Sequence, residues 1–318
     1  MNVLVTGGAG FIGSTLVDRL SLRSGNFIYS VDNFDPFYSR GIKESNIALQ
    51  LIKENVKFIE GDIRNLASFE DQIDRVDMVI HLAAKAGVRP SIDHPQAYFD
   101  VNINGTLEVL EFCRRRNIKK VIFASSSSVY GINPKTPWSE SDSDLMPISP
   151  YASSKLACEK MGFTYSHLFQ IQFLALRFFT VFGPRQRPDL AIHKFIHRIE
   201  NNAPIEVYGD GNTSRDYTYV DDVVQGIEAA MNYEESLFEI FNIGNNQRYT
   251  LNQLIDTVSQ VLNKNPRLER KPEQPGDVPH TCADISKSQK KLGYSPSTSL
   301  ITGVEKQAQW QLLLEKHG

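Results

Sequence analysis

The chain has 318 residues, enough to bury a large core, and its 41% hydrophobic and 22% charged content is that of a globular protein. A formal net charge of −3 gives no basic field that would favour nucleic acid or a membrane surface. The three scattered cysteines lack metal-ligand spacing, so no metal site is expected, and they fit a reduced, cytoplasmic protein. No apolar run is long enough to cross a bilayer, and Met1 leads almost directly into the first expected strand. Neither a membrane span nor a signal peptide is therefore expected.

The first expected strand, residues 3–5, is followed at once by a glycine pattern. Its apolar sequence is typical of a buried parallel strand, and the stretch that begins with Phe11 and Ile12 has the spacing of an amphipathic helix. Between them lie three glycines at G-x-x-G-x-x-G spacing: Gly7, Gly10 and Gly13. A strand, a glycine turn and a helix in this order predict a dinucleotide site. The first glycine allows the tight turn, the second the approach of a pyrophosphate, and the third close helix packing. The alternative is an ordinary glycine turn.

The second expected strand, residues 27–31, ends in an acidic side chain. Asp32 comes 19 residues after Gly13, close to the spacing at which a carboxylate accepts hydrogen bonds from the ribose diol of a bound dinucleotide. The same carboxylate would repel the 2′-phosphate of NADP. The sequence therefore predicts NAD as the cofactor.

Strands and helices continue to alternate through the first half of the chain. Strands are expected at residues 56–60, 78–82, 121–124 and 171–176, and helices at 41–54, 96–116 and 150–169. This alternation predicts an α/β fold, a doubly wound parallel Rossmann sheet with helices on both faces. We expect it to form an NAD-binding domain of residues 1–176.

Past residue 177 the strands become short, and glycine and proline interrupt the chain more often. Helices are expected at residues 220–231 and 251–262. We expect residues 177–318 to form mainly a smaller α/β substrate lobe over the carboxyl edge of the sheet, with some segments returning to the first domain.

A tyrosine and a lysine open the helix expected at residues 150–169. Tyr151 and Lys155 are four residues apart and therefore share one helix face. A nearby ammonium group lowers the pKa of a phenol, which lets a tyrosine act as a base near neutral pH. Four serines, residues 125–128, end the strand before this helix. The alternative is a helix start with a surface tyrosine and lysine.

The order of these motifs resembles that of the extended short-chain dehydrogenase/reductase family over essentially the whole chain. Asp62-Ile63, Leu82-Ala83-Ala84 and Asn102 also fall in family order. The resemblance implies that Ser126 hydrogen-bonds the reacting oxygen, that Lys155 holds the nicotinamide ribose and activates the tyrosine, and that Asp62 contacts the adenine. Alternatively, Asp62 caps a helix that starts near Leu66. The implied cofactor-binding residues are Gly7, Gly10, Phe11, Ile12, Gly13, Asp32, Asn33, Asp62, Ile63, Leu82, Ala83, Ala84, Tyr151 and Lys155.

Within that family the sequence is most similar to nucleotide-sugar 4-epimerases, above all those that act on UDP-glucuronate. Residues 84–95, 177–189, 214–222 and 274–277 carry this similarity. It places Arg215 at the UDP diphosphate, where an arginine fork suits phosphate oxygens, and Asp277 at the ribose. For each arginine alone, a surface salt bridge is the commoner role. The implied substrate-binding residues are Arg89, Ser127, Ser128, Thr180, Arg185, Arg215 and Asp277.

Three positions separate the subfamilies. Ser127 and Ser128 stand where dehydratases carry an Asp-Glu pair, and Ser128 stands where decarboxylases carry a glutamate. Thr180 stands where hexose 4-epimerases carry an asparagine. These hydroxyl groups, together with Arg185, suit a C6 carboxylate better than a neutral hydroxymethyl group. The alternative is that Thr180 and Arg185 only pack and face solvent.

The expected reaction is the reversible inversion of C4 in UDP-glucuronate to give UDP-galacturonate, with bound NAD and a 4-keto intermediate. Relatives of this kind imply a homodimer built on the helices near residues 96–116 and 150–169. Three alternatives stay open: a 4-epimerase of UDP-glucose or UDP-N-acetylglucosamine, a net NAD-dependent dehydrogenase or reductase of a nucleotide sugar, and a non-enzymatic NAD sensor. The intact set of Ser126, Tyr151 and Lys155 argues against the sensor, which has no need of it.

Overall fold

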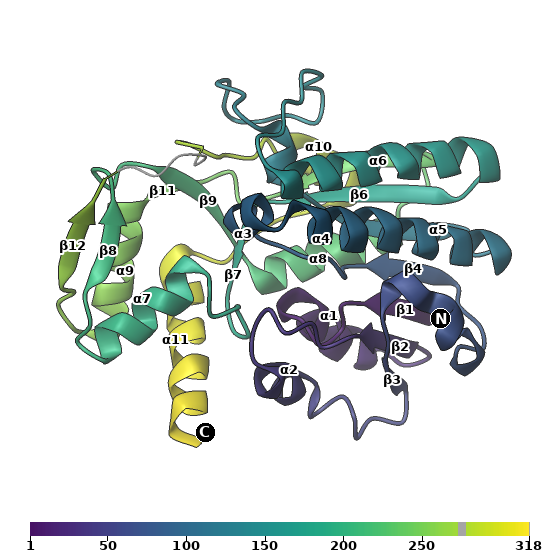
Figure 1. Ribbon diagram of the computed structural model, residues 1–318, viewed down its shortest axis with the longest axis horizontal. Helices are drawn as coiled ribbons and strands as arrows, with labels where there is room; N and C mark the ends of the chain where they lie inside the picture. The colour runs from purple at the N-terminus through teal and green to yellow at the C-terminus, as the bar shows by residue number, and fades with distance from the viewer. Residues whose placement is uncertain (273–277, 318) are drawn as a thin grey trace. The chain divides into compact units, whose positions relative to one another are not determined.

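The computed structural model describes residues 1–272 and 278–317 and divides into two compact units (Figure 1). The first contains residues 1–132, 143–177 and 227–241, and the second contains residues 133–142, 178–226 and 242–318. The sequence suggests a boundary at residue 177, and one crossing between the units lies there. The chain also crosses elsewhere, so that each unit is made of several separate segments.

The first unit is built on a seven-stranded sheet with the order β10-β6-β5-β4-β1-β2-β3. Strands β1 to β5 pair in parallel with their neighbours. Strand order changes direction between β1 and β4, the place where such sheets bind ligands at their carboxyl edge. This arrangement confirms the predicted Rossmann fold. The strands are β1 (Asn2–Thr6), β2 (Phe27–Asp32), β3 (Val56–Glu60), β4 (Met78–His81), β5 (Lys120–Ser126), β6 (Gln172–Phe178) and β10 (Phe238–Ile243).

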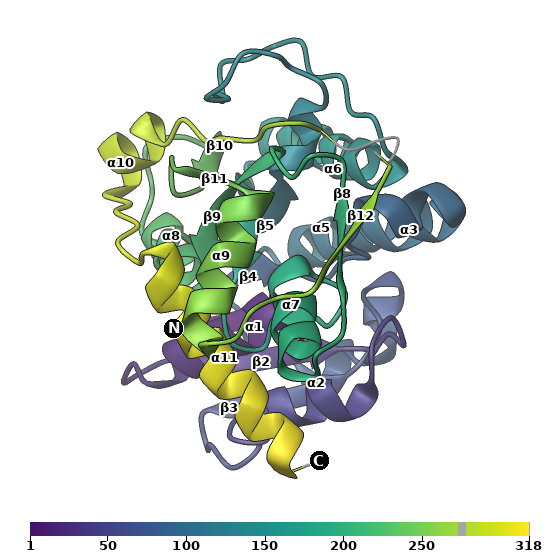
Figure 2. The same cartoon turned by 90° about the vertical axis from the view of Figure 1, so that its left-hand side faces the viewer.

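Helices cover both faces of this sheet. α5 (Gly105–Arg115) and α6 (Pro150–Phe169) lie side by side on one face, and α1 (Phe11–Ser21) lies on the other (Figures 1 and 2). Apolar side chains of α5, α6 and the central strands form one buried core, in which burial of each large side chain contributes roughly 1.5–3 kcal/mol. The remaining helices of the first half are α2 (Arg40–Ile47), α3 (Val88–Asp93) and α4 (Pro95–Phe99).

Two helices differ from their predicted extents. The helix expected at 41–54 ends at Ile47, because the chain turns there and the buried Gln50 amide donates to Ser14 O on α1 at 2.9 Å. The helix expected at 96–116 is interrupted by a π-helical turn, Asp100–Asn104, between α4 and α5. Hydrophobic periodicity alone does not reveal either interruption.

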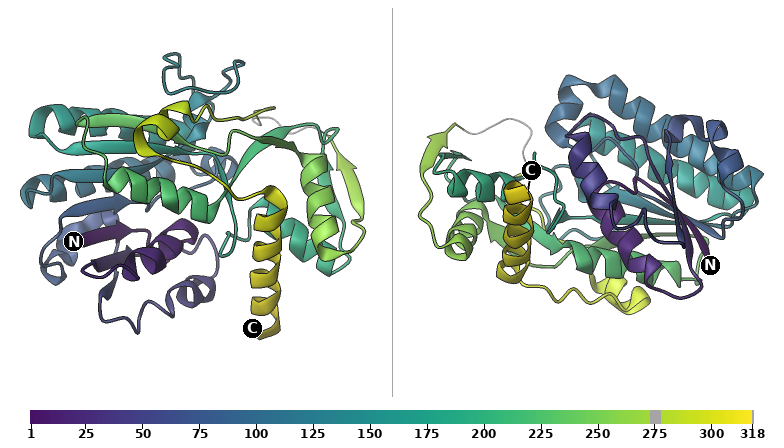
Figure 3. Two further views of the ribbon diagram at one scale, coloured as in Figure 1. Left: turned by 180° about the vertical axis from the view of Figure 1, so that it is seen from behind. Right: turned by 90° about the horizontal axis from the view of Figure 1, so that it is seen from below.

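The second unit contains two small sheets and a group of helices (Figures 2 and 3). One sheet has the order β11-β9-β7, and the other pairs β12 with β8. Helices α7, α9 and α11 pack against one another beside these strands. α8 (Val220–Met231) begins in the second unit and ends in the first. The elements are β7 (Thr180–Phe182), α7 (Ala191–Glu200), β8 (Ile205–Tyr208), β9 (Ser214–Tyr219), β11 (Arg248–Thr250), α9 (Leu251–Leu262), β12 (Leu268–Lys271), α10 (Ser286–Leu292) and α11 (Leu300–His317).

Residues 133–142 join the second unit through Trp138. The indole is fully buried, and its Nε1 donates to Asn133 O at 2.9 Å. The backbone of Trp138 donates to Cys282 O and accepts from Asp284 N, both at 2.8 Å. Two backbone hydrogen bonds and one buried aromatic ring therefore fix this segment.

Within residues 1–272 and 278–317, no helix combines the length and the apolar character that a membrane span needs. The same residues contain no group of three or more His, Cys, Asp or Glu side chains arranged to hold a metal ion. Cys113, Cys158 and Cys282 are buried, free thiols.

Candidate functional site

The glycine turn joins β1 to α1 in the first unit. Gly7 has a φ of +75°, and its N–H donates to Val31 O on β2 at 2.7 Å. A Cβ on Gly7 would lie 2.8 Å from Ala83 N, and a Cβ on Gly13 would lie 2.0 Å from Gly7 O, so neither position has room for a side chain. Gly10 is the N-cap of α1 and has no side chain to occupy the first N–H groups of the helix. The turn therefore offers backbone donors to a pyrophosphate.

Asp32 ends β2 with its carboxylate buried. Its Oδ2 accepts from Ala9 N at 3.2 Å, and its Oδ1 accepts from Phe34 N at 2.8 Å. Lys43 on α2 is also buried and brings its Nζ within 3.4 Å of Oδ1. The sequence indicated Asp32 but not Lys43, because only the fold shows which of several charged residues on α2 faces the carboxylate.

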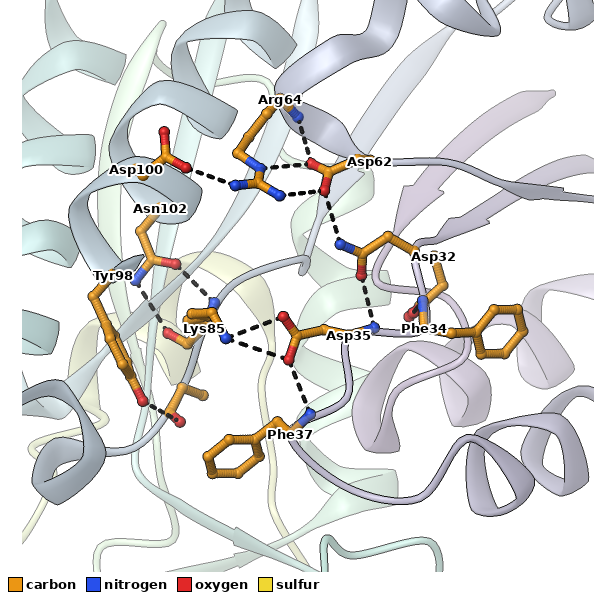
Figure 4. A network of polar contacts seen from close by, with 12 residues as sticks. Asp32, Phe34, Asp35, Phe37, Asp62, Arg64, Lys85, Tyr98, Asp100 and Asn102 are labelled. Carbon is orange, nitrogen blue, oxygen red and sulfur yellow. Dashed lines mark hydrogen bonds and ion pairs between the residues drawn. The ribbon is translucent and has the colours of Figure 1, made fainter. Parts of the chain in front are cut away.

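A polar network surrounds Asp62, which follows β3 (Figure 4). Asp62 is the N-cap of a short 3₁₀ helix, η1 (Ile63–Ser68), and accepts from Arg64 N at 2.9 Å. The Arg64 guanidinium lies 2.7 Å from Asp62 Oδ2 and 2.6 Å from Asp100 Oδ2. Asn33 Nδ2 also donates to Asp62, at 2.9 Å. The hydrogen bonds from Arg64 lower the pKa of Asp62 to about 2. The capping role is therefore present, and the adenine contact stays a prediction.

Asn102 holds the loop that follows β4. It is buried in the π-helical turn, and its Oδ1 accepts from Lys85 N at 2.8 Å. Its Nδ2 donates to Lys85 O at 3.1 Å and to Ser154 Oγ on α6 at 2.9 Å. The Lys85 ammonium reaches the next loop, where it pairs with Asp35 at 3.0 Å (Figure 4). The Asn102 amide thus connects the loop of residues 82–85 with α6, the helix that carries the predicted catalytic residues Tyr151 and Lys155.

A hydrogen bond joins the strand that carries Ser126 to the helix that carries Lys155. Ser126 is the last residue of β5, and Tyr151 and Lys155 lie in the first two turns of α6. Lys155 Nζ donates to Ala124 O on β5 at 2.7 Å. Burial lowers the pKa of Lys155 to about 8. The ring of Tyr151 meets that of Tyr98 edge to face, with 6.3 Å between centroids.

The predicted hydroxyl groups after β5 also lie together. Ser126 Oγ accepts from Ser128 N and donates to Ser128 Oγ, both at 3.1 Å. These bonds start another 3₁₀ turn, η4 (Ser127–Tyr130). The first unit therefore gathers Ser126, Ser127 and Ser128 at the carboxyl end of one strand.

A buried chain of hydrogen bonds runs from the cofactor turn toward α6. His81 Nδ1 lies 2.7 Å from Thr6 Oγ1, and His81 Nε2 lies 3.1 Å from Thr106 Oγ1. Thr106 gives its one hydroxyl proton to Asn102 O, at 2.6 Å, so Nε2 is the donor of the histidine and Nδ1 the acceptor. Burial, and secondly the charge of Lys155, lower the pKa of His81 to about 3. The ring is therefore neutral, and no local pattern in the sequence indicates its role.

We expect His81 to make the protein sensitive to mild acid. Its pKa rises from about 3 in the folded chain to its ordinary 6.5 on unfolding, so the unfolded state binds more protons between these values. Stability then falls by about 2 kcal/mol between pH 7 and pH 5 from this residue alone. Denaturant titrations of the wild type and His81→Gln at both pH values measure the difference.

His167→Gln supplies the control, because it makes the same substitution at an exposed position of α6. An equal loss of stability between pH 7 and pH 5 in the wild type and His81→Gln would contradict the assignment of a neutral, buried ring.

The second unit places two predicted substrate residues on neighbouring strands. Thr180 begins β7 and pairs with Tyr217 of β9, two residues after Arg215 on the same strand. Arg215 Nη1 donates to Ser214 O at 2.9 Å and to Pro279 O at 3.2 Å. These two bonds engage one nitrogen of a fork that has five donor hydrogens.

Arg185 occupies a strained turn in the same unit. The turn closes through Gln186 N and Gly183 O at 3.1 Å, and Arg185 has a φ of +69°, which glycine normally supplies at this position. The buried Gln186 locks the turn, since its Nε2 donates to Val181 O at 3.1 Å and its Oε1 accepts from Gln307 Nε2 at 2.6 Å. Strain held in place by such contacts is typical of functional positions.

Asp216, which the sequence did not single out, anchors β9 beside Arg215. Its buried carboxylate accepts from Asn245 N at 2.7 Å, Asn246 N at 2.9 Å, and Ala283 N at 3.0 Å. Burial raises its pKa to about 6 against these hydrogen bonds. In the sequence, Asp216 is indicated by its position directly after Arg215, the residue predicted to bind the diphosphate.

Two predicted substrate residues remain. Arg89 is exposed at the second position of α3. Asp277 lies outside the described residues. The first unit thus carries Arg89 with the serine set, and the second carries Thr180, Arg185 and Arg215.

Comparison with known proteins identifies the family. Residues 3–244 match the model of the NAD dependent epimerase/dehydratase family. The chain belongs to this family. It is 37% identical to a UDP-glucuronate 4-epimerase from Thermodesulfobacterium geofontis, over 96% of this chain and 95% of the relative. It is 38% identical to UDP-glucuronate 4-epimerase 2 of Arabidopsis thaliana, over 100% of this chain and 77% of the relative.

The solved structures agree with this assignment. The UDP-glucuronic acid 4-epimerase of Bacillus cereus, in complex with UDP-glucuronic acid and NAD, superposes with a TM-score of 0.91. It is 36% identical and covers 99% of this chain and 100% of that one. The predicted extended short-chain dehydrogenase/reductase family, its fold and its NAD dependence are thereby confirmed.

The residues of this family member fit NAD. The glycine turn has no room for side chains and offers free backbone to a diphosphate, and the Asp32 carboxylate lies at the end of the next strand. The other predicted cofactor residues follow the carboxyl ends of β1 to β4 or begin α1 and α6. They are Phe11, Ile12, Asn33, Asp62, Ile63, Leu82, Ala83, Ala84, Tyr151 and Lys155.

Proposed function

We propose that the protein is a UDP-glucuronate 4-epimerase that interconverts UDP-glucuronate and UDP-galacturonate. One observation carries the proposal. Lys155 on α6 donates a hydrogen bond to Ala124 O, two residues before Ser126 at the end of β5. Tyr151 lies one helical turn before Lys155. Relatives that are 37–38% identical over nearly the whole chain and bear this name support the choice of substrate.

The chain's own side chains handle the proton at O4. Tyr151, as phenolate, takes the proton from the C4 hydroxyl and later returns it. The Ser126 hydroxyl turns away from Ser128 and donates a hydrogen bond to the same oxygen, and the buried Lys155 charge stabilises the phenolate. NAD, when bound, takes up the hydride of C4 and gives it back to the opposite face of the sugar. Arg215 holds the diphosphate while the 4-keto sugar rotates about its link to that diphosphate.

The hydroxyl groups have a second task, because the 4-keto intermediate is a β-keto acid. It loses CO₂ when the bond between C5 and C6 aligns with the π system of the C4 carbonyl. Hydrogen bonds from Ser127, Ser128 and Thr180, with the charge of Arg185, hold the carboxylate away from that alignment. A neutral hexose has no carboxylate for these hydroxyl groups and the arginine to bind.

The direct test is to incubate the purified protein, with no added NAD, with UDP-glucuronate and separately with UDP-glucose. NMR or anion-exchange chromatography then resolves the products. UDP-galacturonate from the first substrate alone supports the proposal. UDP-galactose from the second would keep the chemistry and replace the substrate, and inactivity toward both would overturn the proposal.

Thr180→Ala should release a 4-keto pentose nucleotide from UDP-glucuronate, because one hydrogen bond to the carboxylate is lost. Loss of one such bond costs about 1 kcal/mol, which corresponds to a change of roughly fivefold in the ratio of decarboxylated to epimerised product. Product NMR measures that ratio. A lower rate with no pentose would show that Thr180 does not orient the carboxylate. Thr257→Ala, on the exposed side of α9, is the control.

We also propose that two copies of the chain form a homodimer through α5 and α6. We propose in addition that the protein works in the cytoplasm. Phe99 on the adjoining α4, Leu107 on α5 and Phe163 on α6 are large apolar side chains that are exposed in the single chain, and a second copy would bury them. The three free thiols fit a reducing compartment. Sedimentation velocity should give a single species of twice the chain mass, and Phe163→Glu should shift it to the monomer. A monomeric wild type would contradict the dimer.

A further inference from the structure

We propose that the buried ion pair between Glu159 and Arg177 is a clamp that positions residues 125–130 and thereby protects the keto acid intermediate from decarboxylation. This inference rests on the proposed function and names two positioning residues for it. Both side chains lie in the first unit, and neither is expected to touch the sugar.

The pair is a two-point contact in the interior. Arg177, near the end of β6, and Glu159, on α6, are each only 1% exposed. Arg177 Nε lies 3.0 Å from Glu159 Oε1, and Nη2 lies 2.8 Å from Oε2. Burial of two charges carries a large desolvation cost, so a buried pair is weak grounds for a stabilising role and better grounds for fixed geometry. Two parallel hydrogen bonds fix both the distance and the plane of the partners.

The pair reaches both ends of the segment that carries the predicted substrate hydroxyls. At one end, Ser125 Oγ donates to Glu159 Oε1 at 2.5 Å. At the other end, the Arg177 guanidinium lies 4.7 Å above the centre of the Tyr130 ring, which is fully buried. Ser126, Ser127 and Ser128 lie between these two contacts.

The clamp is also continuous with the helix of the proton-transfer residues. Glu159 lies one helical turn after Lys155 and two turns after Tyr151 on α6. A shift of Glu159 therefore displaces Ser125 relative to the phenol and the ammonium. The strand β5, its turn and α6 are held as one body by four buried side chains, those of Ser125, Tyr130, Glu159 and Arg177.

The chemistry makes this geometry matter. In the unwanted reaction the C5–C6 bond breaks, its electron pair moves onto the C4 carbonyl to form an enolate, and the carboxylate leaves as CO₂. C5 then takes a proton, and the hydride taken from C4 stays with the reduced cofactor unless it returns to the pentose. The reaction requires the C5–C6 bond to align with the carbonyl, so hydroxyls that move by a fraction of an ångström no longer prevent it.

The test uses the holoenzyme and UDP-glucuronate. NMR gives the ratio of decarboxylated products, UDP-4-keto-pentose plus UDP-pentose, to UDP-galacturonate. Ser125→Ala removes only the hydroxyl contact, and Glu159→Gln removes the charge. We expect the ratio to rise at least fivefold in both and to return toward the wild-type value in Ser125→Thr, which restores the hydroxyl.

Matched controls make the same changes elsewhere in the first unit. Ser166→Ala removes a buried hydroxyl at the far end of α6, and Glu228→Gln neutralises a buried glutamate paired with Arg23. Both should leave the ratio unchanged. If Glu159→Gln does not fold, Ser125→Ala and Ser125→Thr decide the question.

Two results would count against the proposal in different ways. An unchanged product ratio in the Ser125 variants, with or without a lower rate, would overturn the clamp and leave the epimerase assignment intact. A wild type that does not convert UDP-glucuronate at all would overturn the proposed function, and the clamp with it.

Discussion

Tyr151→Phe should lower turnover of UDP-glucuronate by about 10³-fold while the cofactor stays bound, because the variant loses only the phenolic oxygen that moves the O4 proton. The ring and its edge contact with Tyr98 remain. The glycine turn and Asp32, which we expect to bind the cofactor, are unchanged. Turnover is measured by product NMR, and bound NAD by its release on denaturation of the purified variant.

Tyr165→Phe is the matched control, since it makes the same change almost four helical turns further along α6, where the hydroxyl donates to Glu111 at 2.6 Å. Its activity should equal that of the wild type. If Tyr151→Phe keeps more than about a tenth of the wild-type activity, another group takes the proton. Loss of NAD together with activity would show that the phenol is needed for binding rather than for chemistry.

Lys155→Met should make the cofactor-free protein more stable and nearly inactive. Burial lowers the pKa of Lys155 from its ordinary 10.5 to about 8, so keeping it charged at pH 7 costs the folded state about 3 kcal/mol. Methionine removes this cost and gives up the bond to Ala124 O, worth about 1 kcal/mol. The net gain of about 2 kcal/mol is measured by denaturant titration, and turnover should fall by about 10²-fold or more.

The sign of the pH dependence separates this explanation from simple repacking. The unfolded chain holds the lysine proton more tightly between pH 8 and pH 10.5, so wild-type stability gains from a rise in pH across that window. Lys155→Met has no such group and should lose its advantage by pH 10. An advantage that is equal at pH 7 and pH 10 would mean that the buried charge is not its source.

Local patterns predicted those parts of the structure that depend on neighbouring residues alone. The glycine turn was predictable because Gly7 needs a positive φ and Gly13 leaves no space for a Cβ. The shared helix face of Tyr151 and Lys155 was predictable because both lie in α6 and four residues make about one helical turn. In these cases the physical cause lies within a few residues of the observed structure.

The residues that the sequence did not reveal act across long stretches of chain. Lys43 meets Asp32 only because α2 folds back beside β2, and Arg177 meets Glu159 only because β6 returns alongside α6. The order of motifs indicated Asn102, but its contacts depend on a π-helical turn, which differs from an ordinary helix by hydrogen-bond register and is not visible in hydrophobic periodicity. Likewise, nothing local indicates that residues 227–241 rejoin the first unit.

The division of the chain between the two units also determines which unit tryptophan fluorescence reports. The protein has two tryptophans, Trp138 and Trp310, and both belong to the second unit, one of them because residues 133–142 cross into it. Indole emission therefore reports unfolding of that unit alone, whereas far-ultraviolet circular dichroism reports both. If the two signals change at the same denaturant concentration, the units unfold as one cooperative system; separate midpoints would give the stability of each half without any added label.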